Sequence, residues 1–87
     1  MKILLVKYGT VLSSRPAGKE AYLTARAYIL GDKPKTLEID FAGVKVLSPS
    51  WADEFLTPLK KEYQKNFIIL PSGNPSVIAS LKMINLG

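Results

Sequence analysis

Apolar and polar residues follow one another along this chain in a succession that predicts strands and helices by turns. Short apolar runs with β-branched members indicate strands at residues 3–6, 36–41 and 67–70. Elsewhere, apolar side chains recur at three- and four-residue spacing, which predicts amphipathic helices. Their stripes are Ala21, Ala25, Tyr28 and Ile29, then Ala52, Phe55, Leu56, Leu59 and Tyr63, and last Val77, Ile78, Leu81 and Ile84.

Serine, proline and glycine mark where the first helix begins and ends. Ser13 or Ser14 is expected to cap it, with Pro16 in its first turn. Gly18 costs about 1 kcal/mol in a helix interior, so we expect it early in the helix or held there by a packing requirement. Gly31 is expected to take the left-handed conformation that often ends a helix.

Three further features are less regular. Val11-Leu12 is expected to form a brief second strand that pairs back on the first after the turn at Gly9. The apolar run at residues 44–47 is expected to extend the preceding strand after a break at Gly43. Pro58 lies inside the second helix, where it removes a backbone hydrogen bond and predicts a kink.

Strands that alternate with helices predict an α/β fold, with the later strands largely parallel through right-handed crossovers. We expect residues 1–87 to form a single small domain. Its sheet is expected to be mixed but mostly parallel, with about four strands packed against three helices. A small flavodoxin-like sheet fits the same pattern.

Composition restricts the chemistry. The 87 residues include no cysteine and no histidine, which excludes disulfides, thiolate nucleophiles, imidazole bases and ordinary zinc sites. We expect no cofactor and no metal site. No apolar run approaches the ~18 residues of a membrane span, so we expect a cytoplasmic protein without a membrane partner. The net charge of +5 invites a nucleic-acid interpretation, but the basic residues are spread along the chain.

The segment LEIDFAGVKVLSPSWADEF, residues 37–55, resembles the centre of STAS domains, the fold of the anti-sigma factor antagonists. Asp40 ends a strand, a second apolar run follows, and Ser50 falls where the antagonists carry a phosphorylated serine. The chain is more similar still to a bacterial STAS-like family of unknown function, on LSSR at residues 12–15, on LSPSWADEF at 47–55 and on the Asn74-Pro75 turn. This resemblance extends from Gly9 to Leu81.

The resemblance implies a STAS-like fold and a regulatory protein-interaction module, with the recognition surface at Ser48–Glu54. By family analogy, its partner is a histidine-kinase-type ATPase or an anti-sigma factor. The antagonists carry Asp-Ser-Ser-Gly where this chain has Ser48, Pro49, Ser50 and Trp51. The fold therefore carries over more directly than the phosphorylation switch.

Two interpretations of the serines stay open. In the first, Ser48 or Ser50 only caps the second helix, with Asp53 reaching back in a capping box if Ser50 is the cap; this contributes about 1 kcal/mol. In the second, Ser50 accepts a phosphate at the positive end of the helix, which alters the contact surface without unfolding the domain. Trp51 is either a half-buried anchor of the second helix or an exposed interface residue.

Charged residues complete the set of candidate site residues. Asp53 and Glu54 are candidate partner contacts beside Ser48, Ser50 and Trp51. Ser14 and Arg15 could lie near the same helix start in so small a domain and contact a phosphate or carboxylate there.

No carboxylate pair has a catalytic motif and no phosphate-binding loop pattern is present, so we expect a protein that is not an enzyme. We rank a protein partner ahead of two alternatives. One is a small-anion or nucleotide site at a helix N-terminus, and the other is a basic nucleic-acid-binding domain.

Overall fold

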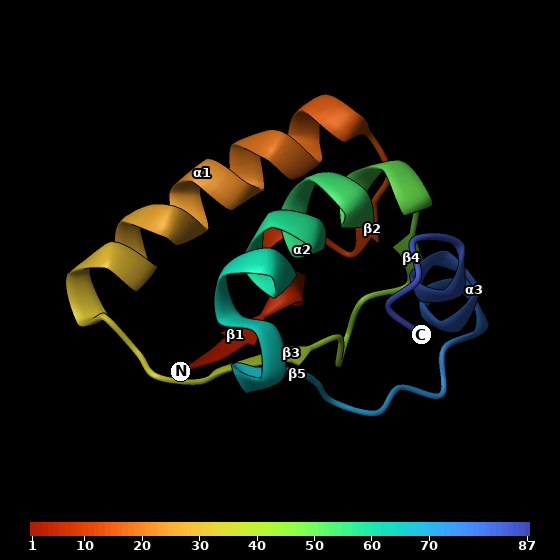
Figure 1. Ribbon diagram of the computed structural model, residues 1–87. Coiled ribbons are helices and arrows are strands. Elements are labelled where there is room, and N and C mark those ends of the chain that lie inside the picture. Colours follow the sequence, from red (N-terminus) through yellow and green to blue (C-terminus); the bar gives the residue numbers. More distant parts are fainter.

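The computed structural model describes residues 1–87, and its elements follow the predicted order (Figure 1), except that residues 44–47 do not extend the preceding strand: Val46–Leu47 forms a separate strand in a second sheet. They are β1 Lys2–Leu4, the 3-10 helix η1 Leu5–Tyr8, β2 Val11–Leu12, α1 Arg15–Asp32, β3 Leu37–Asp40, β4 Val46–Leu47, α2 Pro49–Tyr63, the 3-10 helix η2 Gln64–Asn66, β5 Phe67–Ile69 and α3 Pro75–Met83. The predicted α/β fold with parallel strands and three α-helices is confirmed, and the five strands are divided between two sheets.

Every strand pairing in the two sheets is parallel. β1, β3 and β5 form a three-stranded sheet in which Ile3 lies opposite Ile39 and Ile39 opposite Ile69. β2 pairs with β4, with Leu12 opposite Leu47. The prediction that the second strand pairs back on the first is therefore wrong. The η1 turn separates β2 from β1, and β2 pairs with a strand from much later in the chain.

The helices are distributed unevenly around the three-stranded sheet. Figure 1 shows α1 and α2 next to each other on one side of that sheet, while α3 lies beside β4. Side chains that alternate along the strands point toward α1 and α2 and form the core of the domain. Among them, Leu37 and Ile39 have no exposed surface, and Ile3 and Phe67 are almost completely buried.

The two long helices approach each other closely at Gly18, the fourth residue of α1. A Cβ at this position would lie only 2.6 Å from the carbonyl oxygen of Trp51 in α2 and 2.9 Å from its Cα. The early position and the packing requirement expected for this glycine are thus both present. Beneath the contact, the Trp51 and Phe55 rings stack with 4.9 Å between centroids, and the Tyr8 ring is tilted against both.

The N-terminal end of α1 is as predicted from the sequence, but its C-terminal end is not. Ser14 is the N-cap, its Oγ accepting a hydrogen bond from the Ala17 amide at 3.2 Å. At the other end, the helix continues through Gly31, and Lys33 takes the left-handed conformation with φ of 49°. The prediction for Gly31 is therefore wrong, because the helix runs farther and ends only where Pro34 prevents its continuation.

Replacing Gly18 by alanine is expected to lower the free energy of unfolding by about 1–3 kcal/mol, because the new methyl group overlaps backbone atoms that cannot move aside. The matched control is Gly31→Ala in the same helix, where a Cβ meets nothing within 4 Å. That variant is expected to be neutral or to gain up to about 1 kcal/mol from helix propensity. Urea unfolding monitored by circular dichroism measures both. Equal midpoints for the two variants would contradict close packing at Gly18.

Candidate functional site

The pairing of β2 with β4 brings two helix starts together. Because these strands are parallel, their carboxyl ends meet at the same edge of the sheet. α1 begins at Arg15, shortly after Leu12, and α2 begins at Pro49, shortly after Leu47, so both helices leave from that edge (Figure 1). We refer to this region as the helix-start junction, made up of Ser14, Arg15, Ser48, Ser50, Asp53 and Glu54.

Ser48 connects the two helices through its hydroxyl group. The Oγ accepts a hydrogen bond from the Trp51 amide at 3.1 Å, so Ser48 is the N-cap of α2. The same hydroxyl donates to the Ser13 carbonyl oxygen at 2.9 Å. The alternative in which Ser50 caps the helix through a box with Asp53 is therefore wrong, because Ser48 is the cap and the Asp53 carboxylate bonds to Arg15 and Thr57.

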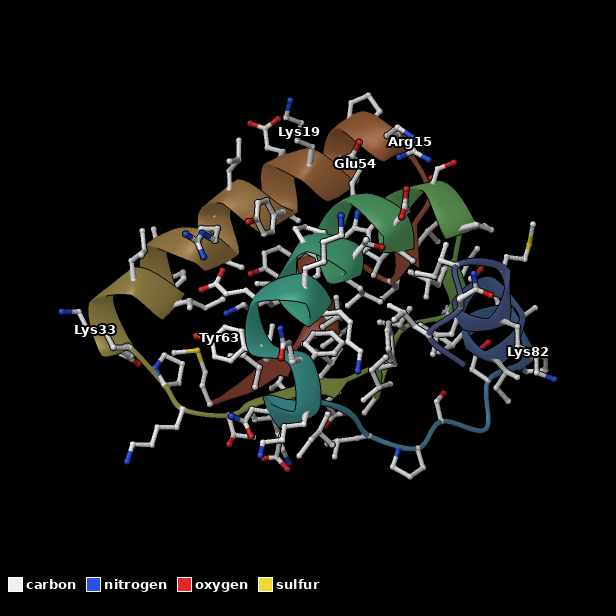
Figure 2. All side chains as sticks on the ribbon, viewed as in Figure 1. Arg15, Lys19, Lys33, Glu54, Tyr63 and Lys82 are labelled. Carbon is white, nitrogen blue, oxygen red and sulfur yellow. The ribbon has the colours of Figure 1, made fainter.

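Arg15, at the start of α1, reaches across to α2 (Figure 2). Its Nη1 donates to Asp53 Oδ2 at 3.1 Å and to Glu54 Oε1 at 3.3 Å. The second oxygen of Asp53 accepts a hydrogen bond from the Thr57 hydroxyl at 2.8 Å. Since 51% of the Arg15 side chain is exposed, these ion pairs contribute little to stability, and the guanidinium is accessible from outside.

Hydrogen bonding within the junction shifts two pKa values. The bond from Thr57, followed by the bond from Arg15, lowers the pKa of Asp53 below its ordinary value. The bonds to Asp53 and then to Glu54 raise the pKa of Arg15. The junction thus presents one guanidinium held between two carboxylates.

Ser50 and Trp51 are neighbours in α2 with opposite surroundings. The half-buried Ser50 follows Pro49 in the first turn, and none of the side-chain hydrogen bonds of the junction uses its hydroxyl. Trp51 has only 1% of its surface exposed. The interpretation of Trp51 as an exposed interface residue is therefore wrong, and the anchor is buried more deeply than half, because the ring lies inside the core against Phe55. The Trp51 ring is therefore in the core and does not cover Ser50 from the outside.

Two sets of interacting residues are not predicted by the sequence. The hydrogen bond between Thr57 and Asp53 spans four residues of α2, a spacing that could have revealed it. The second set lies on α3, where Ser76 Oγ accepts a hydrogen bond from the Leu47 amide at 3.0 Å and donates to the Leu47 carbonyl oxygen at 3.1 Å. The Asn74 amide group also donates to two carbonyl groups beside β4. No local signal in the sequence indicates these contacts.

The surface of the junction is not hollowed. The hollows of the domain, with volumes between about 140 and 310 Å³, lie beside α1 and next to β5; Trp51 lines one of those against α1, and none is lined by Ser50, Asp53 or Glu54. No three histidine, cysteine or acidic side chains gather where they could hold a metal ion. None of the helices has the length and apolar composition needed to cross a membrane.

Ser48→Ala is expected to lower the free energy of unfolding by about 0.5–2 kcal/mol, because it removes the N-cap of α2. Ser50→Ala is the matched control two residues away and is expected to change stability by less than about 0.5 kcal/mol, since its hydroxyl has no partner in the junction. Chemical unfolding of the two variants tests this difference. A larger loss for Ser50→Ala than for Ser48→Ala would contradict the assignment of the cap.

Thr57→Val and Arg15→Gln are each expected to raise the pKa of Asp53 toward its ordinary value, with Thr57→Val having the larger effect. A carboxylate whose pKa is lowered by folding stabilises the domain above the ordinary aspartate pKa, near about 4. That contribution is lost as the pH falls through the lowered pKa, so both variants should be less sensitive to acid between these two pH values. Carboxyl-detected NMR titration measures the pKa directly, and an unchanged value in both variants would refute these contacts.

The family of the chain follows from comparison with known proteins. A protein-family model described as a STAS-like domain of unknown function matches residues 23–71, more than half of the 87 residues. The match includes Ser48–Glu54 but not Ser14 or Arg15. No curated protein and no solved structure matches the chain. With its parallel strands, three α-helices and this match, the chain belongs to the family of STAS-like domains of unknown function.

Proposed function

We propose that this domain is a non-catalytic regulatory module that binds a partner protein through the helix-start junction, and that phosphorylation of Ser50 releases the partner. The proposal rests on the different hydrogen bonding of Ser48 and Ser50. Ser48 caps α2 and holds it to the chain before α1, which leaves the hydroxyl of Ser50 without a structural task. A modification there can change the surface while the fold stays intact.

The position of Ser50 suits a phosphate. It lies in the first turn of α2, where the helix dipole favours negative charge. It is also three and four residues before Asp53 and Glu54, so a phosphate there would repel these two carboxylates on the same helix face and compete with them for Arg15. In the phosphorylation step, a kinase transfers the terminal phosphoryl group of ATP to Ser50 Oγ, the hydroxyl proton passes to a base of the kinase, and ADP leaves.

The charge of the junction explains how the partner would be released. Arg15 is the cation that contacts Asp53 and Glu54. A phosphate adds about −1.5 to −2 charges beside these carboxylates and is a strong acceptor for the same guanidinium. The phosphorylated surface is therefore strongly negative and rearranged at Arg15. A partner selected for the unmodified surface loses its electrostatic match.

Family resemblance suggests which partner this is. The anti-sigma factor antagonists act on histidine-kinase-type ATPases or anti-sigma factors, and we propose a partner of this class. Nucleic acid ranks behind a protein because the basic side chains do not form a stripe. In Figure 2, Lys19 lies near the start of α1, Lys33 at its end and Lys82 on α3.

The proposal predicts that a negative charge at Ser50 abolishes partner binding, with no effect on the far-ultraviolet circular dichroism spectrum. Tagged wild-type protein and the Ser50→Asp variant are purified from nuclease-treated lysate of the native host, and captured proteins are quantified by mass spectrometry. Ser50→Asn is the matched control, with similar size and no charge. The expected result is one protein partner captured by wild type and by Ser50→Asn but lost with Ser50→Asp.

Two results would overturn this function. If Ser50→Asp and Ser50→Asn capture the partner equally, the charge of Ser50 does not control binding. If nothing but nucleic acid is bound, and only before nuclease treatment, the domain is a nucleic-acid binder. Phosphopeptide mapping of the protein from its host gives an independent reading, since the proposal requires phosphate on Ser50 and not on Ser48.

A further inference from the structure

The three-stranded sheet has one covered face and one face without a helix. All-parallel sheets normally have both faces covered, yet α1 and α2 lie on the same side of β1, β3 and β5 (Figure 1). The residues that alternate with the buried ones point to the other side. We call this side the open face, and its residues are Lys2, Leu4, Glu38, Asp40 and Ile68.

The open face combines apolar flanks with an acidic centre. Leu4 on β1 is 45% exposed and Ile68 on β5 is 42% exposed. Between them, the central strand β3 carries Glu38 and Asp40. None of the ion pairs of the domain involves these two carboxylates. The open face therefore carries two acidic side chains and one basic side chain, Lys2. Its charge is negative, whereas the net charge of the whole protein is +5.

The negative charge of the open face favours some binding partners over others. A second copy stacked face to face would bring the carboxylates of both copies together with too few lysines to neutralise them. Phosphate groups of nucleic acid or of anionic lipids would be repelled in the same way. The favourable occupant carries positive charge along its middle and apolar side chains at its edges.

We propose that the open face of β1–β3–β5 is a docking surface for an amphipathic helix of a partner protein that carries basic residues four positions apart. Glu38 and Asp40 are two residues apart on one strand, about 6.6 Å along its length. Side chains at positions i and i+4 of a helix have Cβ atoms about 5–6 Å apart, so two lysines or arginines can meet both carboxylates.

The width of the face also suits a helix. Neighbouring strands are about 4.8 Å apart, so Leu4 and Ile68 lie about one strand to either side of β3. An α-helix with its side chains is about 10–12 Å wide and covers the three strands. The basic side chains of the helix would lie along β3, and the apolar side chains on either side of them would bury Leu4 and Ile68.

The proposal is tested by NMR titration of the isotope-labelled domain at roughly physiological ionic strength. The probe is a synthetic amphipathic peptide of leucine and lysine with lysines at i and i+4. Its counterpart with glutamate in place of lysine serves as the control peptide. The lysine peptide is expected to shift the amide signals of Leu4, Asp40 and Ile68, and the glutamate peptide is expected not to bind.

Charge reversal on the open face separates specific docking from general attraction. Glu38→Lys is expected to weaken binding of the lysine peptide by at least about tenfold. The matched control is Glu20→Lys on α1, which makes the same change in net charge away from the open face and should weaken binding by less than about twofold. Should Glu38→Lys fail to fold, Glu38→Gln is expected to weaken binding by about threefold to fivefold.

Several results would overturn the proposal: no binding of the lysine peptide, equal binding of both peptides, signals that shift at the helix-start junction instead, or equal losses for Glu38→Lys and Glu20→Lys. This docking surface is independent of the function proposed above. Ser50 lies on α2, on the other side of the sheet, so Ser50→Asp should leave peptide binding unchanged. Either proposal can therefore fail without the other.

Discussion

The close approach of α1 to α2 at Gly18 is the contact on which the arrangement of this domain depends. With no side chain at that position, α1 comes within van der Waals contact of the backbone at Trp51. Two consequences follow from that one contact. The Trp51 ring points inward, where it stacks on Phe55 and fills the core. At the same time, the first turns of both helices lie near enough for Arg15 to reach the acidic side chains of α2. A bulkier residue at Gly18 would overlap the Trp51 backbone and strain both.

The short β2–β4 pairing holds together the two segments that lead into α1 and α2. It is only two residues long on each strand, so backbone hydrogen bonds alone hold it weakly. Side chains from the flanking segments reinforce it. Ser76 bonds to both backbone groups of Leu47, and the Asn74 side chain holds the carbonyl groups before β4. Ser48 adds a bond to the chain that leads into α1. These side-chain hydrogen bonds position the two helix starts of the junction.

The layered arrangement leaves the domain with two chemically different surfaces. On the helix side, one guanidinium is bonded to two carboxylates on the helix that also carries Ser50. On the sheet side, two carboxylates without ion pairs lie between exposed apolar side chains. Burial of Trp51 removes the residue that would have made the junction an apolar interface. The junction consequently depends on charge, and charge is the property that phosphorylation changes most.

The sequence by itself determined the order of the elements, most of the buried helix positions, a serine cap at residue 13 or 14 and the family; of the predicted apolar stripes, Tyr28 and Ile78 are exposed. These depend on local periodicity and on capping chemistry, which neighbouring residues specify. Tertiary structure decided the remainder. A two-residue strand such as Val11–Leu12 carries no information about its partner, so its pairing with β4 required the assembled fold. The choice between Ser48 and Ser50 as the cap depended on which hydroxyl lies nearer the free backbone groups. Whether Trp51 faces the core or a partner, and whether Arg15 meets Asp53 and Glu54, are properties of the packed helices. Residues 38 or more positions apart come together there only because the domain has folded.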